Sequence, residues 1–314
     1  MKALRIHRFG EPLVLDDVDE PRPEPGERVV DIEYAGVDPL DVWLATGRTR
    51  PDLPLPWIPG TEATGRVDGR RVLVWGHGLG VRRPGLYAER AAVPEDALLP
   101  LPDGVDPVQV AAVPVAGRTA WRLVHDVARV QGGETVLVLG ASGGVGSLIL
   151  QLARRAGATA YGQTGSPAKA GWIRDQGAED VLVCGPDELA GLAGALRPQV
   201  VFDPLGDGFT AAAVEALAPH GRVAIFGASA GDRADVNVRA VYSRGLSILS
   251  YAGLLEPERE VRPVLEKVVE ALAQGRLHVP IDDVIPLEQG AEAHRRILQR
   301  AVRGKLVLSV GERS

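Results

Sequence analysis

The feature that most constrains the fold of this chain is an apolar run that leads into a glycine-rich turn and then an amphipathic helix. The run starts at Val136, the turn reads Gly140-Ala-Ser-Gly-Gly-Val-Gly146, and the helical pattern continues through Ala153. Glycines let a pyrophosphate approach bare backbone N–H groups, and a helix N-terminus adds partial positive charge. Because the flanking strand and helix are the context that the motif requires, the turn predicts a dinucleotide site. Its predicted ligands are Ala141, Ser142, Gly143, Gly144, Val145 and Gly146.

The segment about 20 residues beyond this turn indicates which dinucleotide is bound, because an acidic residue there would hold the ribose diol of NAD. The chain reads Tyr161-Gly-Gln-Thr-Gly-Ser-Pro-Ala-Lys169, without a carboxylate to repel a 2′-phosphate. Lys169 can pair with such a phosphate, and Thr164 and Ser166 lie beside it. The alternative for Lys169 is a solvated helix charge. The segment favours NADPH over NADH.

Composition excludes several classes of function. The 314 residues suffice for two domains, and the net charge of −6 argues against a nucleic-acid surface. The single cysteine, Cys184, excludes a disulfide framework and a thiolate-rich zinc site. Neither a signal-peptide pattern nor an apolar run of about 18 residues occurs, so we expect a cytoplasmic protein without a membrane segment.

The hydrophobic period changes near Pro114. Residues 1–113 alternate short β-like runs with Pro/Gly turns, which predicts a compact β-rich domain. Residues 114–275 alternate apolar strands with helices, which predicts a doubly wound parallel sheet of the α/β class. The last segment, 276–314, contains a strand near 305–310 that we expect to return to the first domain. Strands are predicted at 135–140, 159–163, 180–184, 198–203, 222–227 and 246–250, and helices at 117–129, 145–157, 167–177, 207–218 and 258–275.

An ordered set of motifs resembles the zinc-free quinone oxidoreductase (zeta-crystallin-like) branch of the medium-chain dehydrogenase/reductase superfamily. The resemblance covers essentially the whole chain. It implies a GroES-like domain, a Rossmann domain, an active site in the cleft between them, and a homodimer formed through Leu246–Ser250. The motifs are Gly36-Val-Asp-Pro-Leu-Asp41, Ile58-Pro-Gly-Thr-Glu-Ala-Thr-Gly65, Pro114-Val-Ala-Gly-Arg-Thr-Ala120, the Gly140–Gly146 turn, Val201-Phe-Asp-Pro-Leu-Gly206, Gly221-Arg-Val-Ala-Ile-Phe-Gly227, Ala291-Glu-Ala-His294 and Gly304-Lys-Leu-Val-Leu308.

The residues at the expected metal position argue against zinc. Zinc-dependent relatives place Cys near position 38 and His-Glu at 61–62, whereas this chain has Asp38 and Thr61-Glu62. The cysteine-rich structural lobe is also missing. A catalytic zinc needs about three protein ligands, so we expect no metal. Glu62 is expected to cap or pair within the barrel.

The resemblance implies further cofactor contacts. Thr119 lies in a matching motif, and Leu205, Gly227 and Ala228 follow the fourth and fifth predicted strands, where ligands bind in such sheets. Arg300 aligns with an arginine that reaches the 2′-phosphate in relatives; neighbouring arginines make an ordinary surface charge the alternative. Cys184 stands where relatives carry an aromatic partner for that phosphate, so a hydrogen bond and a stacking surface are lost.

The substrate side is expected around Asp38, where relatives carry Asn. An ionised Asp only accepts hydrogen bonds, so Asp38 is protonated by burial, orients the substrate differently, or is a turn residue before Pro39. Asp41 is expected to cap the helix that carries Trp43, which replaces a tyrosine and would form an apolar wall. Tyr251 matches an aromatic of the substrate cleft, with core packing as the alternative.

A glycine-rich loop carries Trp75 and His77. His77 is a candidate proton donor to an enolate, and an ordinary surface histidine is the alternative; Trp75 is assigned to the substrate wall. The resulting hypothesis is NADPH-dependent hydride transfer to a quinone or another α,β-unsaturated carbonyl. An enoyl-thioester or polyketide enone reductase remains open, as does a non-catalytic NADPH-binding protein of crystallin-like or RNA-binding type.

Overall fold

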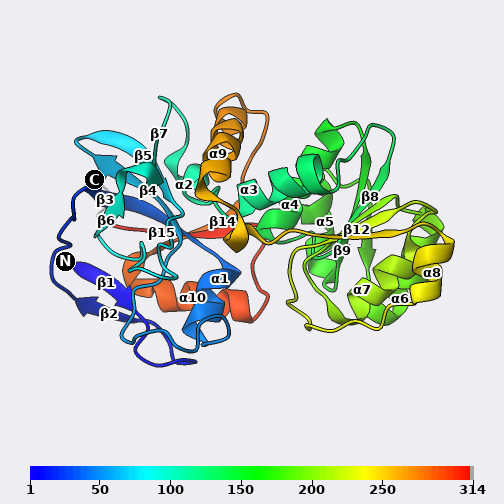
Figure 1. Ribbon diagram of the computed structural model, residues 1–314, viewed down its shortest axis with the longest axis horizontal. Coiled ribbons are helices and arrows are strands. Elements are labelled where there is room, and N and C mark those ends of the chain that lie inside the picture. Colours follow the sequence, from blue (N-terminus) through cyan, green and yellow to red (C-terminus); the bar gives the residue numbers. More distant parts are fainter. Residues whose placement is uncertain (312–314) are drawn as a thin grey trace. The chain divides into compact units, whose positions relative to one another are not determined.

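The computed structural model describes residues 1–311, which form two compact units. The first consists of Met1–Gly117 together with Pro257–Ser314, and the second of Arg118–Glu256 (Figure 1). Helix α3 (Ala116–Trp121) crosses the first boundary. Within the described residues, no helix is both long and apolar enough to span a bilayer.

The second unit is built on a six-stranded sheet in which every neighbouring pair is parallel. Counted along the unit, the strand order is 3-2-1-4-5-6, which is that of dinucleotide-binding sheets. This order confirms the predicted doubly wound fold. In sheet order the strands are β10 (Val181–Val183), β9 (Thr159–Thr164), β8 (Thr135–Val138), β11 (Val200–Asp203), β12 (Arg222–Ile225) and β13 (Ser247–Ser250).

Helices connect these strands at the predicted places, with two additions, at residues 186–196 and 238–243. Helix α6 (Pro186–Leu196) is absent from the sequence-based prediction, although Pro186 at its first position and the acidic pair Asp187 and Glu188 are a helix-start signal. The other helical segments are η2, a π-helical turn (Arg122–Val127), α4 (Gly144–Arg155), η3 (Pro167–Lys169), α5 (Ala170–Asp175), α7 (Asp207–Ala216), α8 (Val238–Ser243) and η4 (Gly253–Leu255).

The first unit contains a seven-stranded sheet whose long central strand, β3, pairs with three others. The C-terminal strand β15 runs antiparallel to β3, with Leu308 opposite Ala35, which confirms that the chain end returns to the first domain. The strands are β3 (Glu27–Val37), β4 (Glu62–Val67), β5 (Arg70–Trp75), β6 (Arg90–Pro94), β7 (Leu98–Pro100), β14 (Ile281–Pro286) and β15 (Lys305–Ser309), with a separate pair β1 (Lys2–Arg5) and β2 (Val14–Asp17).

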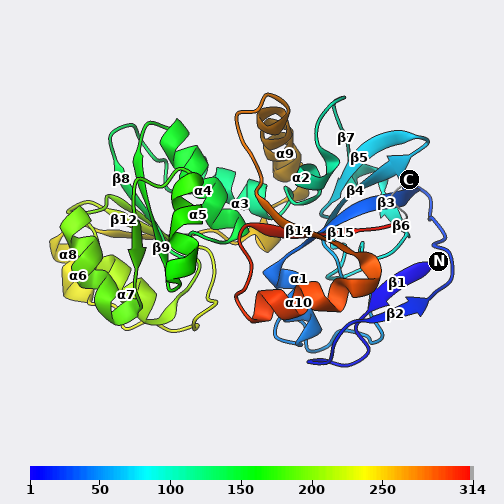
Figure 2. The same ribbon diagram turned by 180° about the vertical axis from the view of Figure 1, so that it is seen from behind.

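Helices α1 (Pro39–Ala45), α2 (Pro107–Ala111), α9 (Glu258–Ala273) and α10 (Gly290–Leu298) complete this unit, with η1 (Glu95–Ala97) and η5 (Leu287–Gln289). Both views place α9 beside α2 (Figures 1 and 2). The sequence pattern assigns α9 to the nucleotide domain, because this helix follows the last strand of that domain. It belongs instead to the first unit, where Arg262 donates to the Leu98 carbonyl at 2.8 Å and Val268 packs against Gly117.

Candidate functional site

The glycine-rich turn between β8 and α4 has the backbone geometry of a phosphate site. Gly140 has a φ of +57°, which favours glycine, and a Cβ on Gly146 would lie 2.9 Å from the Ala141 Cα atom. Both positions therefore require glycine. No side chain of the described residues caps α4 at Gly143, so the N–H groups of its first turn remain available to an anion. The turn fits a dinucleotide pyrophosphate.

Gln163, at the end of β9, holds this turn in place. Its Oε1 accepts from the Gly140 N–H at 3.1 Å, and its Nε2 donates to the Cys184 carbonyl at 2.7 Å. Ala141 also donates to the Gln163 carbonyl, at 3.0 Å. Sequence reasoning missed this role, although a lone amide in a buried strand is its signal. Cys184 is itself buried, which raises the pKa of its thiol.

The segment after β9 is where the ribose phosphate would lie. Thr164 is 5% exposed, and its Oγ1 accepts from the Ser166 N–H at 3.2 Å, which fixes the start of the turn. Lys169, at the end of η3, is partly exposed. Their contact with a 2′-phosphate stays a prediction. Arg300, predicted to contact the same phosphate, lies in the first unit just after α10 and is exposed.

The loops that follow β11 and β12 lie beside the glycine-rich turn. A Cβ on Gly140 would lie 3.5 Å from Leu205 Cδ2, and one on Gly227 would lie 2.7 Å from the Pro204 carbonyl oxygen. The Ala230 N–H donates to the Leu205 carbonyl at 2.7 Å. The structure therefore brings together three of the predicted cofactor segments at the carboxyl edge of one sheet, where nucleotides bind in this topology.

Asp203 shapes the first of these loops. Its Oδ1 accepts from the N–H groups of Leu205, at 2.8 Å, and Gly206, at 3.2 Å. Its Oδ2 accepts from the Thr210 hydroxyl at 2.5 Å. Burial raises the pKa of Asp203, although these hydrogen bonds oppose the shift. The carboxyl group thus positions the loop rather than meeting a ligand.

Tyr251, a predicted substrate residue, belongs to a polar cluster in the second unit. Its hydroxyl donates to Glu256 Oε2 at 2.5 Å, and Glu256 Oε1 pairs with Arg122 Nη2 at 2.5 Å. Burial, together with the Glu256 charge, raises the pKa of Tyr251, so its hydroxyl stays protonated. The half-buried Thr119 lies on α3, the helix immediately before Arg122. Sequence reasoning missed Glu256, since nothing local marks its partners.

In the first unit, Asp38 lies in a fully buried ionic cluster. Lys305 Nζ lies 2.5 Å from Asp38 Oδ1 and 2.8 Å from Glu62 Oε1, and all three side chains are at most 3% exposed. Glu62 Oε2 accepts from the Val115 N–H at 2.7 Å. Burial lowers the pKa of Lys305, but its two carboxyl partners outweigh this and raise it overall. Burial and the nearby Asp38 raise the pKa of Glu62. The expected pairing of Glu62 within the barrel is confirmed.

Asp41 extends the cluster along α1. Its Oδ2 accepts from the Asp38 N–H and from the Tyr87 hydroxyl, both at 2.9 Å, so the expected capping role is confirmed. Burial, followed by repulsion from Asp38, raises the pKa of Asp41 to about 7. Two buried oxygens, Asp38 Oδ2 and Asp41 Oδ1, have no partner within residues 1–311. Trp43, on the same helix, is half-buried beneath the Arg48 guanidinium, 5.4 Å from its ring centroid.

The loop after β5 holds the other predicted residues. Trp75 is 2% exposed and therefore lies mainly in the core, with its ring centroid 5.8 Å from that of His77. The His77 N–H donates to Glu258 Oε1 at 2.7 Å, and its backbone has a φ of +52°. The Nε2 atom of His77 is buried and finds no acceptor in the described part of the chain. The catalytic role of His77 and the substrate contact of Trp75 stay predictions.

The residues at the position of zinc in related enzymes do not fit a metal ion. The ammonium of Lys305 lies between Asp38 and Glu62, within hydrogen-bond distance of both, and Thr61 stands where a histidine ligand would be needed. Across residues 1–311, no three His, Cys, Asp or Glu side chains are grouped to hold a metal. The Lys305 ammonium group therefore pairs with the side-chain oxygens of Asp38 and Glu62 that a metal ion would need as ligands.

The chain is similar to known oxidoreductases over its full length. Family models match at residues 24–103 (alcohol dehydrogenase GroES-like domain) and 176–308 (zinc-binding dehydrogenase). A Sus scrofa quinone oxidoreductase is 30% identical, covering 98% of this chain and 97% of its own length. The quinone oxidoreductase from Thermus thermophilus, also solved with NADPH, is 32% identical with a TM-score of 0.84, covering 98% and 100%. An NAD-dependent alcohol dehydrogenase is 31% identical with a TM-score of 0.87, covering 99% and 100%.

Proposed function

Since the chain belongs to the medium-chain dehydrogenase/reductase superfamily, with quinone oxidoreductases among its full-length relatives, we propose that it is an NADPH-dependent oxidoreductase that reduces quinones or other α,β-unsaturated carbonyls without zinc. The superfamily and the two-domain class are those expected from the sequence motifs. The proposal rests on the uncapped start of α4, on the preceding turn in which Gly140 and Gly146 must be glycine, and on a β9 end that lacks a carboxylate.

Each half of the cofactor is assigned to a different set of residues. The Gly140–Gly146 turn binds the pyrophosphate through backbone N–H groups, and Leu205, Gly227, Ala228 and Thr119 flank the nicotinamide and its ribose. Lys169, Thr164 and Ser166 hold the 2′-phosphate, and Arg300 adds a second cation. NADPH supplies the hydride and the reducing power when bound. The chain binds, orients and keeps water away.

The class of acceptor is inferred from the residues at the position where related enzymes hold zinc. A ketone without conjugation needs an electrophile to take up negative charge on oxygen, whereas a quinone or enone delocalises that charge itself. Lys305 occupies the place of such an electrophile and is already held by two carboxyl groups. Trp43, Trp75 and Tyr251 are proposed to form the apolar walls. Asp38, whose Oδ2 has no partner in the described chain, and His77 are the proposed sites of proton transfer.

A panel of acceptors tests this function. NADPH oxidation is followed at equal concentrations of 1,4-benzoquinone, 2-cyclohexenone and cyclohexanone, with and without a chelator. We expect turnover of the first two, none of cyclohexanone, and rates unchanged by the chelator. Turnover of cyclohexanone alone, or a loss that zinc restores, contradicts the proposal. Absence of turnover with all three supports a binding role instead.

We also propose a homodimer formed through the edge of the second unit. Strand β13 pairs only with β12 among the described strands, which leaves its other edge open. Ile248 on this strand is 47% exposed, and Tyr242 on α8 is 72% exposed. Unpaired apolar edges are sites of association. Light scattering during gel filtration should give twice the chain mass, and Ile248→Lys should give the monomer; a monomeric native chain refutes the proposal.

A further inference from the structure

A cavity lies wholly within the first unit, between α1, α10 and the loop that joins β1 to β2. Its volume is about 310 Å³, and none of the residues that line it is assigned to the proposed reaction. The walls are mostly hydrocarbon, with Leu13, Val42 and Ala45 at most 7% exposed. Leu298 lines the same pocket but is 61% exposed, which places it at the mouth. The pocket is therefore an apolar space with an opening.

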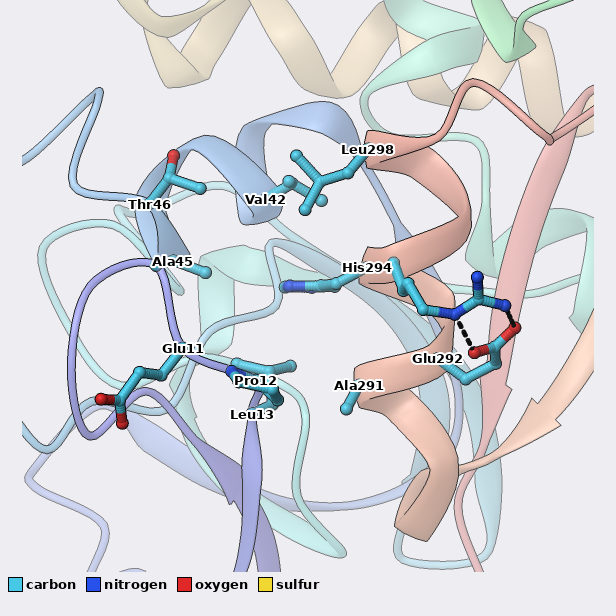
Figure 3. A pocket seen from close by; sticks show the side chains of 12 residues that line it. Glu11, Pro12, Leu13, Val42, Ala45, Thr46, Ala291, Glu292, His294 and Leu298 are labelled. Atoms are coloured by element: carbon cyan, nitrogen blue, oxygen red, sulfur yellow. Dashed lines mark hydrogen bonds and ion pairs between the residues drawn. The ribbon is translucent and has the colours of Figure 1, made fainter.

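A buried polar side chain, that of His294, enters this space. The imidazole of His294 projects from α10 toward α1, with a nitrogen at its tip (Figure 3). His294 is 7% exposed, and its Nε2 has no hydrogen-bond partner in the part of the chain that the structure describes. A buried polar atom without a partner is unfavourable, and a ligand that pairs with it removes this cost.

Burial also fixes the charge of this imidazole. It lowers the pKa of His294 to about 4, so the ring is neutral at physiological pH. A neutral imidazole carries one donor and one acceptor nitrogen. The tip can thus accept a hydrogen bond from a hydroxyl group or donate one to it. A carboxylate or an ammonium finds no charge of opposite sign on this side chain.

The charged residues at the rim already have partners. Arg295 Nη2 lies 2.5 Å from Glu292 Oε1, and Arg8 Nη1 lies 3.6 Å from Glu11 Oε1. Figure 3 shows Glu292 on the side of α10 that faces away from Val42 and Ala45. The rim therefore offers no unbalanced charge to an ionic ligand, and an uncharged occupant is favoured.

The volume limits the size of that occupant. An apolar cavity of about 150 Å³ holds benzene, and functional ligand pockets begin near roughly 300 Å³. We propose that this pocket binds a neutral aromatic molecule of one or two rings that carries one hydroxyl group. The rings pack against Leu13, Val42 and Ala45, and the hydroxyl pairs with His294 Nε2. The site is independent of the proposed reductase activity.

The test uses 2-naphthol and naphthalene, which differ only in the hydroxyl group. Each is titrated into the full chain with saturating NADP⁺, and the nitrogen resonances of the His294 ring are followed by NMR. We expect saturable binding of 2-naphthol with a shift of the Nε2 resonance, and weaker binding of naphthalene. Absence of saturable binding of 2-naphthol up to its solubility limit, or binding that leaves the His294 resonances unchanged, overturns the proposal.

Two variants complete the test, each checked for folding by circular dichroism. His294→Phe keeps a ring of similar size but removes the nitrogen, and should weaken 2-naphthol binding about five- to ten-fold while leaving naphthalene nearly unchanged. Ala291→Leu adds bulk to a partly exposed wall position and should weaken both ligands. Equal affinity of 2-naphthol for the native chain and His294→Phe refutes the assigned hydrogen bond. Quinone reduction that persists in Ala291→Leu separates this site from the reductase site.

Discussion

Replacement of Lys305 by Met removes the cation that pairs with Asp38 and Glu62 in their buried cluster. The methionine side chain has a similar length, so the packing is largely kept. The change leaves a carboxylate in a region where the cluster side chains are at most 3% exposed. Removal of one partner from a buried ion pair is strongly destabilising, since the other charge stays without compensation.

The distance between the charged groups sets the size of the expected loss of stability. Across the 2.5 Å between Lys305 Nζ and Asp38 Oδ1, Coulomb attraction at an effective dielectric of about 20 amounts to ~7 kcal/mol. Folding of the variant no longer removes an ammonium group from water, because methionine carries no charge. This difference offsets several kcal/mol of the lost attraction. We therefore expect Lys305→Met to lower the free energy of unfolding by about 3–5 kcal/mol near neutral pH.

Urea denaturation followed by circular dichroism measures this loss, and the double variant Asp38→Asn/Lys305→Met is its control. The double variant has neither the ammonium group nor a carboxylate at position 38. It should therefore recover more than half of the stability that Lys305→Met loses. The loss in Lys305→Met should also shrink at acid pH, where the carboxylate takes up a proton. A loss below about 1 kcal/mol, or an equal loss in both variants, refutes the assigned ion pair.

Two further predictions concern the nucleotide site. Lys169→Ala should raise the KM for NADPH about ten-fold and leave that for NADH within about two-fold, because only the 2′-phosphate contact is lost. Steady-state kinetics with each cofactor measure both values. An equal rise in KM for both cofactors contradicts the role of Lys169. Gly146→Ala should weaken both cofactors alike, because its Cβ would lie 2.9 Å from the Ala141 Cα atom and displace the turn. Fluorescence titration with NADPH and NADH checks this second variant.

Local patterns are enough to predict the second unit. Each parallel strand is an apolar run followed by a helical period, and the order of these runs along the chain defines the topology. The exceptions have physical reasons. Helix α6 is mostly small and apolar, so its period is weak, and α8 has only six residues, too few to show a period. Helix α9 has a strong period, but a period does not show which unit receives its apolar face.

The ionic cluster shows what a single sequence cannot supply. Lys305 and Asp38 are 267 positions apart, and only the pairing of β15 with β3 brings them together. A signal is nevertheless present, because a lysine that opens an otherwise apolar strand, Lys305-Leu-Val-Leu308, must find a partner if it is buried. Asp38 stands out in the sequence as unusual, but its partner is visible only in the fold.

Two buried groups in the first unit make the pH dependence of stability a sharp test of the structure. Asp41 binds its proton more tightly when folded, with a pKa of about 7 against 3.8, so stability falls as pH rises from about 4 to 7, by up to ~4 kcal/mol. His294 has the opposite sign, because its pKa is about 4 when folded against 6.5, so stability rises over nearly the same range by up to ~3 kcal/mol. In the native chain these two contributions oppose each other. Urea denaturation between about pH 4 and 7 measures the free energy of unfolding of each variant as a difference from the native chain. As pH rises, this difference should increase for Asp41→Asn and decrease for His294→Phe. Differences from the native chain that do not vary with pH would show that neither group is buried as described.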